Sequence, residues 1–426
     1  MNKKIVIKTL GCKLNFSESA AIERLLVERG YTVSSKDSQA DAFIINTCAV
    51  TENAEKKCRQ YIHQIKNNHP QAKIVLVGCF SALQNVKTVE NEVDLLLGSS
   101  DKMNVVAEID RLFGKTNLEE TAKNEAVFFS SYSISERTRS FLKIQDGCDY
   151  FCTYCTVAHA RGRSRSDSIE NVIVNIREIV ANGIKEIVLT GVNIGDFKTK
   201  KEECFFDLLQ AITKIEDLKR LRISSIEPNL LTKEIIDFTA NTNIVLPHFH
   251  IPLQSGCNDI LAKMKRRYQR ELFAEKVCYI KEKMPHACIA ADVIVGFPSE
   301  TEEQFMETYN FINSLPVSML HVFPYSKRPN TPAADMPNQL TNACKNERTK
   351  QLIRLSDEKK RNFYQENSGK ILHALIESKN ENGFLQGFTE NYIRIQIPYN
   401  KQYINEIIKV KLLKIDAKGV YEVEKL

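Results

Sequence analysis

Between residues 139 and 330, strand-length apolar runs alternate along the chain with amphipathic helical segments. The runs "IKEIVLTG" (184–191) and "ACIAADVIVG" (287–296) are typical, and each ends at a glycine that leads into a loop. Regular alternation of this kind predicts a parallel sheet with helices on its faces. About six successive units predict a complete or partial (β/α) barrel, in which the chemistry lies at the carboxyl ends of the strands.

The segments around this barrel predict two further domains in an α/β protein. Residues 1–115 show the same alternation, so we expect an N-terminal α/β domain with a parallel sheet. Residues 116–138 are polar and poorly periodic, and we expect a linker that pairs briefly through residues 126–129. A long charged helix closes the barrel domain, residues 139–366. Residues 367–426 hold short strands separated by Asn, Gly and Lys turns, which predicts a small antiparallel β-barrel.

The composition limits the roles of the twelve cysteines. With 43% hydrophobic and 26% charged residues, the chain is typical of a soluble globular protein, and its net charge of +6 permits a polyanionic partner without requiring one. The N-terminus lacks a signal-peptide pattern, and no apolar run reaches the length of a membrane span, so we expect a cytoplasmic protein. Thiols stay reduced there, so some cysteines are expected to ligate metal or to catalyse, and the rest to be buried.

The stretch "DGCDYFCTYCTVAHARGRSRS" (146–166) places Cys148, Cys152 and Cys155 at a spacing that indicates a metal site. The chain has no second CxxC, so a tetrahedral zinc site would need His159 as its fourth ligand. The alternative is a four-iron cluster held by three thiolates, which leaves one iron open for a substrate or cofactor. The spacing alone leaves both metals open.

This C-x-x-x-C-x-x-C motif, with Tyr154 before its last cysteine and at the exit of the first barrel strand, resembles the radical SAM superfamily. The resemblance implies that the open iron chelates the amino and carboxylate groups of S-adenosylmethionine. It also implies that one electron from the cluster cleaves this molecule to a 5'-deoxyadenosyl radical, while the protein supplies binding and placement. Tyr154 is then a candidate contact of the cofactor.

Other loops at the ends of predicted strands supply further candidate contacts. A glycine lets the backbone approach a bound molecule, a carboxylate such as Glu227 accepts hydrogen bonds from ribose hydroxyls, and the resemblance places adenine near Gly296. Each position taken alone is equally consistent with an ordinary barrel loop. The candidates are Gly191, Ser225, Glu227, Gln254, Ser255, Asp292 and Gly296.

Three more cysteines, Cys12, Cys48 and Cys79, each come just after a predicted parallel strand of the N-terminal domain. Loops after adjacent parallel strands converge on one edge of a sheet, where three cysteines can ligate a second cluster with one open iron. The alternative is three buried cysteines. Cys12 lies in a predicted loop, residues 10–19, and the first helix is expected over 19–30. The other cysteines match no ligand position: Cys58, Cys204, Cys257, Cys278, Cys288 and Cys344.

The two cysteine trios, with "TLGCKLNFSES" and "NTCAVTENAEKK", resemble the methylthiotransferases over essentially the whole chain. The resemblance implies an N-terminal methylthiotransferase domain, a radical SAM domain and a TRAM-like RNA-binding barrel. It implies an enzyme with two [4Fe-4S] clusters that uses two S-adenosylmethionine molecules. The second cluster carries a sulfur that the first molecule methylates, and a radical from the other abstracts a hydrogen from an unreactive C–H bond, which receives the methylthio group.

The motifs "GCKLN", "CDYFCTYC" and "ARGRSRS" are most similar to the class that modifies C2 of N6-threonylcarbamoyladenosine at tRNA position 37. The isopentenyladenosine class more often reads GCQMN, and the class that acts on a ribosomal protein usually reads GCxKN. These two classes are the alternatives, and a zinc-stabilised RNA-binding module without catalysis is a third. An electron donor and a sulfur source are implied partners, but the sequence identifies neither of them, nor the oligomeric state.

In an anticodon loop of tRNA, the target base must be splayed out and held in a pocket. Arginines behind Cys155 and in "AKMKRRYQR" are candidate phosphate contacts, although solvated surface charge is an equally ordinary role. The C-terminal barrel is nearly balanced in charge, so its RNA role depends on the TRAM resemblance; Phe384, Phe388 and Tyr392 are candidate contacts or core residues. The basic candidates are Arg161, Arg163, Arg165, Arg266 and Arg267.

Overall fold

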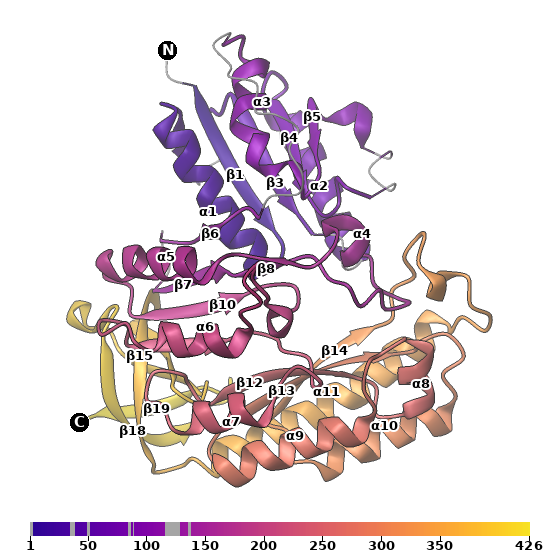
Figure 1. The fold of residues 1–426 in the computed structure, drawn as a ribbon, viewed down its shortest axis with the longest axis vertical. Helices are drawn as coiled ribbons and strands as arrows, with labels where there is room; N and C mark the ends of the chain where they lie inside the picture. Colours follow the sequence, from indigo (N-terminus) through magenta and orange to yellow (C-terminus); the bar gives the residue numbers. More distant parts are fainter. Residues whose placement is uncertain are drawn as a thin grey trace.

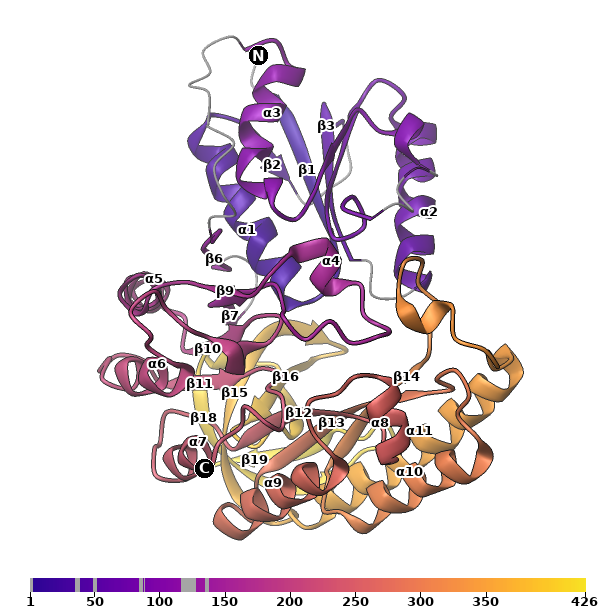
Figure 2. The same cartoon turned by 45° about the vertical axis from the view of Figure 1, so that its right-hand side comes forward.

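The computed structural model describes residues 3–34, 39–48, 52–83, 87, 89–115, 128–134 and 138–426. Figure 1 shows an N-terminal α/β unit at the top, a curved unit of strands and helices below it, and a small β-barrel at the lower left. The turned view in Figure 2 places the small barrel behind the strands of the curved unit. Within the described ranges, no helix has the length and apolar character needed to cross a lipid bilayer.

The N-terminal unit is a parallel sheet in the order β2-β1-β3-β4-β5, as the alternation in the sequence predicts. Both faces of its central strands are buried, Ile44 and Val75 in one core and Ile45 and Leu76 in the other. Burial on two sides explains why these strands read as continuous apolar runs. The elements are β1 (Lys4–Leu10), α1 (Lys13–Glu28), β2 (Thr32–Ser34), β3 (Ala42–Thr47), α2 (Glu52–Asn68), β4 (Lys73–Gly78), β5 (Leu95–Leu97) and α3 (Val105–Leu112).

The first helix begins earlier than the sequence predicts. Residues 13–19 of the expected loop are helical, because α1 starts at Lys13, directly after Cys12. Asn15, Ser17 and Glu18 in its first turns are buried polar residues, so the apolar period that marks a helix is missing there. The loop prediction is therefore wrong from residue 13 onward, and Cys12 occupies the N-cap position of α1.

The central unit is a partial barrel of six parallel strands in chain order, β7-β10-β11 and then β12-β13-β14. Two isolated parallel bridges, Leu221–Val245 and Ser225–His250, join the two halves. This arrangement confirms the predicted partial (β/α) barrel. The elements are β7 (Arg139–Lys143), α5 (Ile169–Ala181), β10 (Glu186–Thr190), α6 (Phe205–Ile212), β11 (Arg220–Ile223), α7 (Lys233–Ala240), β12 (His248–Gln254), α8 (Asn258–Lys263), α9 (Arg270–Lys283), β13 (Cys288–Val295), α10 (Glu302–Ser314), β14 (Met319–Pro324) and α11 (Asn342–Gln365).

Short elements occupy segments that the sequence predicts as loop or linker. The antiparallel pair β8 (Gln145–Asp146) and β9 (Arg165–Ser166) closes the base of the loop that carries Cys148, Cys152 and Cys155, and α4 (Val157–Arg161) lies inside it. β6 (Ser131–Tyr132) pairs with β7. The pairing of the linker that the structure describes falls on β6. Of the predicted residues 126–129, Phe128 and Phe129 belong to no strand, and 126 and 127 lie outside the described residues.

The C-terminal unit is a closed barrel in the order β15-β16-β17-β19-β18. All neighbouring pairs are antiparallel except β17 and β19, which are parallel, so the predicted antiparallel barrel is confirmed apart from that pair. Its strands are β15 (Ile371–Glu381), β16 (Phe384–Thr389), β17 (Arg394–Pro398), β18 (Ile407–Ile415) and β19 (Tyr421–Lys425).

Two aromatic side chains of this barrel pack against the central unit. The ring of Tyr392 stacks on His248 of β12 with centroids 4.3 Å apart, and Phe388 stacks on Tyr392 at 4.9 Å. Both therefore belong to the interface between the two barrels and not to a free surface for RNA. Phe384 is 39% exposed, and it stays a candidate RNA contact.

Candidate functional site

Cys148, Cys152 and Cys155, hereafter the barrel trio, lie on the loop between β8 and α4. Backbone hydrogen bonds fix the loop: the N–H of Cys148 donates to the Gly162 carbonyl at 3.1 Å, and the N–H of Cys155 donates to the Cys152 carbonyl at 3.0 Å. This loop follows the first strand of the partial barrel, at the carboxyl end where barrel enzymes place their chemistry.

Each sulfur of the barrel trio faces a hydrogen-bond donor. The backbone N–H two residues further along donates to the sulfurs of Cys148 and Cys155, at 3.4 Å in both cases, and the Arg266 guanidinium donates to Cys152 at 3.0 Å. Burial raises the pKa of Cys148 to about 11 and that of Cys155 to about 12. These thiols therefore keep their protons near neutral pH until a bound cation replaces them, as in metal sites that form together with their thiolates.

The spread of the sulfurs favours a cluster over a single zinc ion. In the part of the chain that is described, the one group of three ligand-type side chains with all donor atoms within 4.8 Å of one another is His250, Asp292 and His321. At least one pair of sulfurs in the barrel trio is thus more than 4.8 Å apart. Two thiolates on one zinc ion lie at most about 4.6 Å apart, because each Zn–S bond is about 2.3 Å. His159, the proposed fourth zinc ligand, packs its ring edge-on against Phe151.

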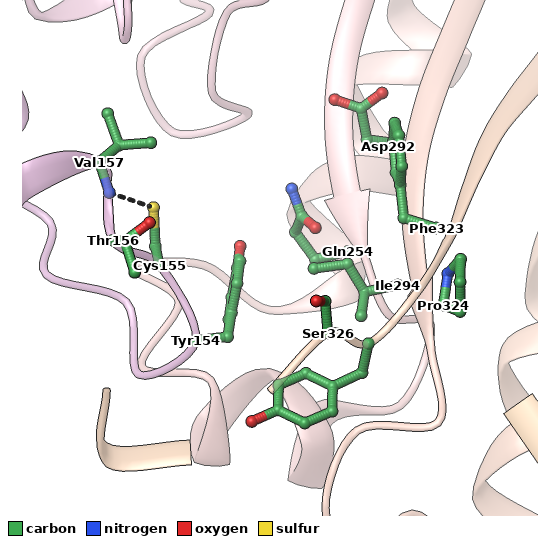
Figure 3. Close-up of a pocket in the computed structure, with 11 residues that line it drawn as sticks. Tyr154, Cys155, Thr156, Val157, Gln254, Asp292, Ile294, Phe323, Pro324 and Ser326 are labelled. Atoms are coloured by element: carbon green, nitrogen blue, oxygen red, sulfur yellow. Dashed lines mark hydrogen bonds between the residues drawn. The ribbon is translucent and has the colours of Figure 1, made fainter. Parts of the chain in front are cut away.

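A cavity of about 240 Å³ opens beside the barrel trio (Figure 3). Its walls combine polar groups with the apolar side chains of Ile294 and Phe323. Two buried polar atoms on it, Oε1 of Gln254 and the hydroxyl of Tyr325, have no hydrogen-bond partner among the described residues. Buried polar atoms require partners, so the cavity suits a ligand that carries both polar and apolar groups. The lining is Tyr154, Cys155, Thr156, Val157, Gln254, Asp292, Ile294, Phe323, Pro324, Tyr325 and Ser326.

The predicted cofactor contacts divide into two groups. Tyr154, Gln254 and Asp292 line the cavity. Ser255 is fully buried behind it, with its hydroxyl 3.1 Å from that of Thr308, so it positions backbone and does not face the cavity. The other predicted contacts are absent from the lining, and their role stays a prediction: Gly191, Ser225, Glu227 and Gly296.

Two of the arginines predicted to contact RNA are buried at the cysteines. The Arg266 side chain is 3% exposed and forms an ion pair with Glu227, and the Arg161 side chain is 2% exposed. Both guanidinium groups have partners inside the protein, which contradicts a direct contact with RNA phosphates. Among the rest, Arg163 and Arg267 are exposed and Arg165 is half-buried.

Cys12, Cys48 and Cys79, hereafter the N-terminal trio, follow the neighbouring strands β1, β3 and β4. The last residues of these strands pair in register, so the three cysteines leave the sheet at the same level. As the topology predicts, they lie at one edge of the sheet.

A buried amide pair fixes this edge. Asn15 of α1 donates to the side-chain oxygen of Asn46 at 2.8 Å and to the carbonyl of Thr47 at 3.0 Å, and it accepts from the thiol of Cys12 at 3.2 Å. Asn46 donates back to the carbonyl of Asn15 at 3.0 Å. The start of α1 is thereby tied to β3, which sets Cys12 relative to Cys48.

Charged side chains that are buried, or in the case of Arg165 half-buried, join the two cysteine trios. Glu18 of α1 accepts from Lys143 at 3.1 Å and from Arg161 at 2.9 Å, and it forms an ion pair with Lys102. Although burial opposes ionisation, the charges of Arg161, Lys102 and Lys143 hold the pKa of Glu18 well below its usual range. The sequence did not single out Glu18, because its partners lie far away in the chain. We call this set the interdomain charge cluster: Glu18, Lys102, Lys143, Asp146, Arg161 and Arg165.

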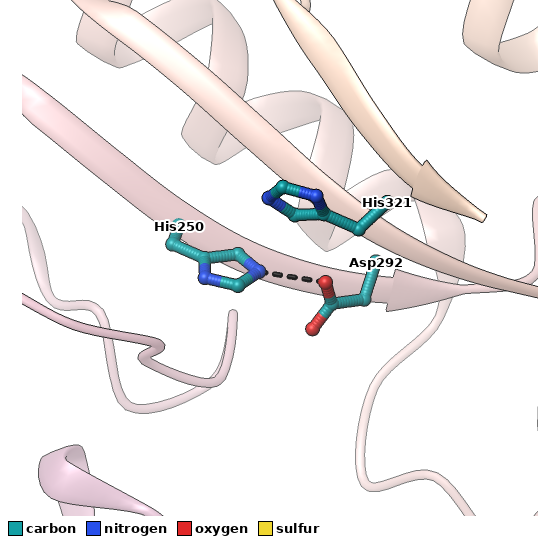
Figure 4. A group of neighbouring side chains, drawn as sticks. All are labelled: His250, Asp292 and His321. Atoms are coloured by element: carbon teal, nitrogen blue, oxygen red, sulfur yellow. Dashed lines mark hydrogen bonds and ion pairs between the residues drawn. The ribbon is translucent and has the colours of Figure 1, made fainter. Parts of the chain in front are cut away.

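A second polar group, of which the sequence analysis named only Asp292, lies inside the partial barrel. His250, Asp292 and His321 come from β12, β13 and β14 and point toward one another (Figure 4). Nε2 of His250 lies 2.7 Å from Oδ1 of Asp292, which also lines the cavity. The sequence carried one signal for this group, the alternation in "HFHIPLQ". Every second residue of that strand is apolar and belongs to the hydrophobic core, so His250 lies on the opposite face of the strand.

Two family descriptions match the chain. Residues 4–98 match the family described as "Uncharacterized protein family UPF0004", and residues 142–312 match the "Radical SAM superfamily". The first range contains the N-terminal trio and the second contains the barrel trio, so each cysteine site falls within one matched range.

Curated relatives resemble the chain over nearly its whole length. A threonylcarbamoyladenosine tRNA methylthiotransferase from Bacillus subtilis is 39% identical over 96% of this chain and 94% of its own length. A protein of the same name from Aquifex aeolicus is 35% identical over 96% of this chain and 99% of its own. A tRNA-2-methylthio-N(6)-dimethylallyladenosine synthase from Lachnoclostridium phytofermentans is 32% identical over 97% and 93%.

Solved structures share the fold at low identity. The radical S-adenosylmethionine methyltransferase TsrM from Kitasatospora setae aligns with a TM-score of 0.57 at 14% identity, over 78% of this chain and 74% of that one. The cobalamin-dependent radical enzyme OxsB aligns with a TM-score of 0.53 at 14% identity, over 86% and 56%. These likenesses show a shared fold over most of the chain.

Proposed function

Because the chain belongs to the radical SAM methylthiotransferases, we propose that it converts N6-threonylcarbamoyladenosine at tRNA position 37 into its 2-methylthio derivative. The observation that carries the proposal is its near-full-length similarity to relatives named for this nucleoside. The two cysteine trios, each at the carboxyl edge of parallel strands, support the chemistry.

At the first site, the barrel trio would hold a [4Fe-4S] cluster beside the cavity that Cys155 lines. When bound there, S-adenosylmethionine supplies the radical that removes hydrogen from an unreactive carbon. Gln254 and Tyr325 offer unpaired polar atoms to the bound molecule, and Ile294 and Phe323 offer apolar surface. Arg266 stabilises the negative charge of the ligated Cys152 sulfur through its hydrogen bond.

At the second site, the N-terminal trio would hold another [4Fe-4S] cluster, and this second cluster is part of the proposal. Three thiolates would leave one iron without a protein ligand, and that iron would carry the sulfur to be transferred. The full reaction then needs two S-adenosylmethionine molecules, one for the methyl group and one for the radical. It also needs an electron donor and a source of sulfur, and the C-terminal barrel is proposed to contact the anticodon loop.

The charges inside the partial barrel support a substrate that carries a carboxylate. A threonylcarbamoyl group ends in one, whereas an isopentenyl group is an uncharged hydrocarbon. Among the described residues, the ammonium of Lys13 has no hydrogen-bond or ion-pair partner, and burial lowers its pKa. Burial is also the main cause that lowers the pKa of His321, and nearby positive charge, that of Lys13 included, lowers it further. With His250 and His321, this lysine supplies donors that suit a carboxylate beside Asp292 and the cavity.

Mass spectrometry of tRNA nucleosides tests this function. Cells that lack the activity should gain 2-methylthio-threonylcarbamoyladenosine when they express the chain, and should not gain it when they express Cys148→Ala or Cys12→Ala. The two variants should differ in vitro: Cys148→Ala stops cleavage of S-adenosylmethionine, whereas Cys12→Ala spares cleavage and stops sulfur insertion. Anaerobic protein should contain about eight irons, and either variant about four.

The control is Cys204→Ala, since Cys204 is exposed and follows no strand of the N-terminal sheet. It should match the wild type in iron content and product. A gain of 2-methylthio-isopentenyladenosine alone would show that the substrate is isopentenyladenosine and not threonylcarbamoyladenosine. A colourless protein that contains zinc would refute the enzyme itself.

A further inference from the structure

A single dipeptide contacts both cysteine trios. The Nε–H of Arg161 donates to the sulfur of Cys79 at 3.2 Å. The carbonyl of the next residue, Gly162, accepts the backbone N–H of Cys148 at 3.1 Å. Consecutive Cα atoms are held about 3.8 Å apart by a trans peptide, so a shift of this dipeptide moves the surroundings of both sites together.

The guanidinium of Arg161 is held on every side. Its Nη1 donates to Glu18 of α1 at 2.9 Å and to Asp146 of β8 at 2.9 Å, and its Nη2 donates to Glu18 at 3.3 Å. Asp146 in turn accepts the backbone N–H of Gly147 at 2.9 Å, directly before Cys148. The side chain is therefore anchored to the N-terminal unit and to the barrel loop at once.

The charge of this region suits an anion at the N-terminal trio. The interdomain charge cluster contains four cationic side chains and two carboxylates, an excess of two positive charges in a buried region. Uncompensated charge in a protein interior is strongly unfavourable. Cys79, which Arg161 contacts directly, is where three thiolates on a metal cluster would bring the opposite charge.

We propose that Arg161 is a positioning residue that fixes Cys79, and the cluster that Cys79 ligates, at one place relative to the Cys148 loop. The inference rests on the proposed function in one point, the second cluster at the N-terminal trio. Arg161 contacts neither substrate nor cofactor and acts through the ligand sulfur. Its hydrogen bond and charge stabilise the more negative reduced cluster, and therefore raise the reduction potential of that cluster.

The test isolates the second cluster by replacing Cys148, Cys152 and Cys155 with Ala. In this background, Arg161→Met should lower the midpoint potential and change the EPR spectrum of the reduced cluster. Arg161→Lys retains the charge and should restore part of the potential. Arg163→Met is the matched control, because Arg163 lies in the same motif with a side chain 78% exposed and pairs with Asp149. It should leave the potential and the spectrum unchanged.

A second measurement tests directly whether Arg161 fixes the position of one cluster relative to the other. With all six cysteines present, pulsed EPR reports the dipolar distance between the two reduced clusters, and Arg161→Met should broaden that distribution while Arg163→Met should not. If Arg161→Met proves too unstable to purify, Arg161→Lys should show the same changes to a smaller degree. Glu18→Gln should broaden the distance distribution, because Glu18 orients the guanidinium, but it should not lower the potential, since it removes a negative charge.

The outcomes separate the two proposals. An unchanged potential together with an unchanged distance distribution in Arg161→Met overturns the role of Arg161 and leaves the second cluster standing. Absence of iron in the Cys148, Cys152 and Cys155 background with Arg161 intact refutes the second cluster and, with it, both proposals. Loss of iron only after Arg161→Met supports the positioning role.

Discussion

Arg266 and Arg267 are adjacent in one basic segment, yet their surroundings give them different roles. Arg266 is buried against Cys152 and Glu227. Arg267 is exposed, lies 4.1 Å over the ring of Tyr150 and donates to the carbonyl of Asp149 at 2.6 Å. Only Arg267 of this pair is available to a phosphate, and a count of positive charge along the chain does not separate the two.

At the same scale, His321 offers a test of how the substrate is recognised. His321→Leu should lower methylthiolation of tRNA that carries threonylcarbamoyladenosine by about 10- to 100-fold, because a hydrogen bond to a charged group contributes about 1.5–3 kcal/mol. Cleavage of S-adenosylmethionine without tRNA should change little, since His321 does not line the cavity. Liquid chromatography of the modified nucleoside and of 5'-deoxyadenosine measures both.

His63→Leu serves as the control for that variant, because His63 lies on α2 with a side chain 59% exposed and pairs with Glu92. It should leave both rates unchanged. Equal loss of activity in His321→Leu on substrates with and without the carboxylate would argue against recognition of that group.

Among the elements, the turn into the cysteine loop has the narrowest steric limits. Gly147 has a φ of +71°, and a Cβ there would lie 2.0 Å from the carbonyl oxygen of Arg163. Gly147→Ala should therefore displace β9 from β8 and cost about 2–4 kcal/mol from left-handed strain and overpacking. We expect anaerobic protein of this variant to lose the iron of the barrel trio and to keep that of the N-terminal trio, as measured by iron analysis.

Gly183→Ala is the control that distinguishes the cost of a left-handed backbone from the cost of a steric clash. Gly183 has a φ of +80°, but a Cβ there would meet nothing within 4 Å, so the variant should cost only the left-handed penalty of about 1–2 kcal/mol. Its iron content should equal that of the wild type. If the two alanine variants bind the same iron, the close approach at Gly147 does not control the loop.

The elements that the sequence predicts well are those whose burial is regular along the chain. The strand β10 is buried throughout and β4 from Ile74 onward, and the glycine or cysteine after each strand marks its end. Convergence of the N-terminal trio follows from that topology. The start of α1 does not, because its first turns bury polar groups such as Asn15 against β3, and only the folded arrangement supplies their partners.

For the whole molecule, a buried carboxylate holds arginines at the interface between the barrels. Glu186 lies 2.7 Å from Arg222 and 2.8 Å from Arg220, and Arg222 donates to the carbonyl of Thr389 in the C-terminal barrel at 2.7 Å. Although burial raises it, the charges of these arginines lower the pKa of Glu186 overall. The interface is thus polar as well as aromatic.

Glu186→Gln should destabilise the protein by about 3–5 kcal/mol, because it leaves buried arginines without a counter-charge. A carboxylate with a lowered folded pKa contributes stability that is present above its unfolded pKa and is lost as the pH falls through the folded value. The variant should therefore lose less stability on acidification than the wild type does. Urea unfolding at pH 7 and pH 4 measures both effects.

Glu406→Gln is the matched control, since Glu406 is 51% exposed and pairs with Lys185 at 2.5 Å. An exposed ion pair contributes about 0–1 kcal/mol, so this variant should unfold almost as the wild type does. Equal destabilisation by the two substitutions would show that the interface does not depend on Glu186.

The contacts between units are the part of the molecule that the sequence leaves open. Tyr392 reads as a surface aromatic or a core residue, yet its partner His248 comes from another unit. Arg328, in the segment after β14, forms a buried ion pair with Glu55 of α2. Such pairs join residues that are far apart in the chain, and neither hydrophobic period nor motif spacing reports them.

The interdomain charge cluster also limits how this protein can be recombined. Glu18 and Lys102 come from the N-terminal unit, whereas Lys143, Asp146, Arg161 and Arg165 come from the barrel. A chimera that takes its first 115 residues from a homologue replaces two of the six residues of this cluster. Unless the homologue has matching charges at both positions, the chimera buries an ion without a counter-charge at the interface between the two units. We therefore expect genetic exchange between homologues to preserve the whole gene more often than it replaces a single domain.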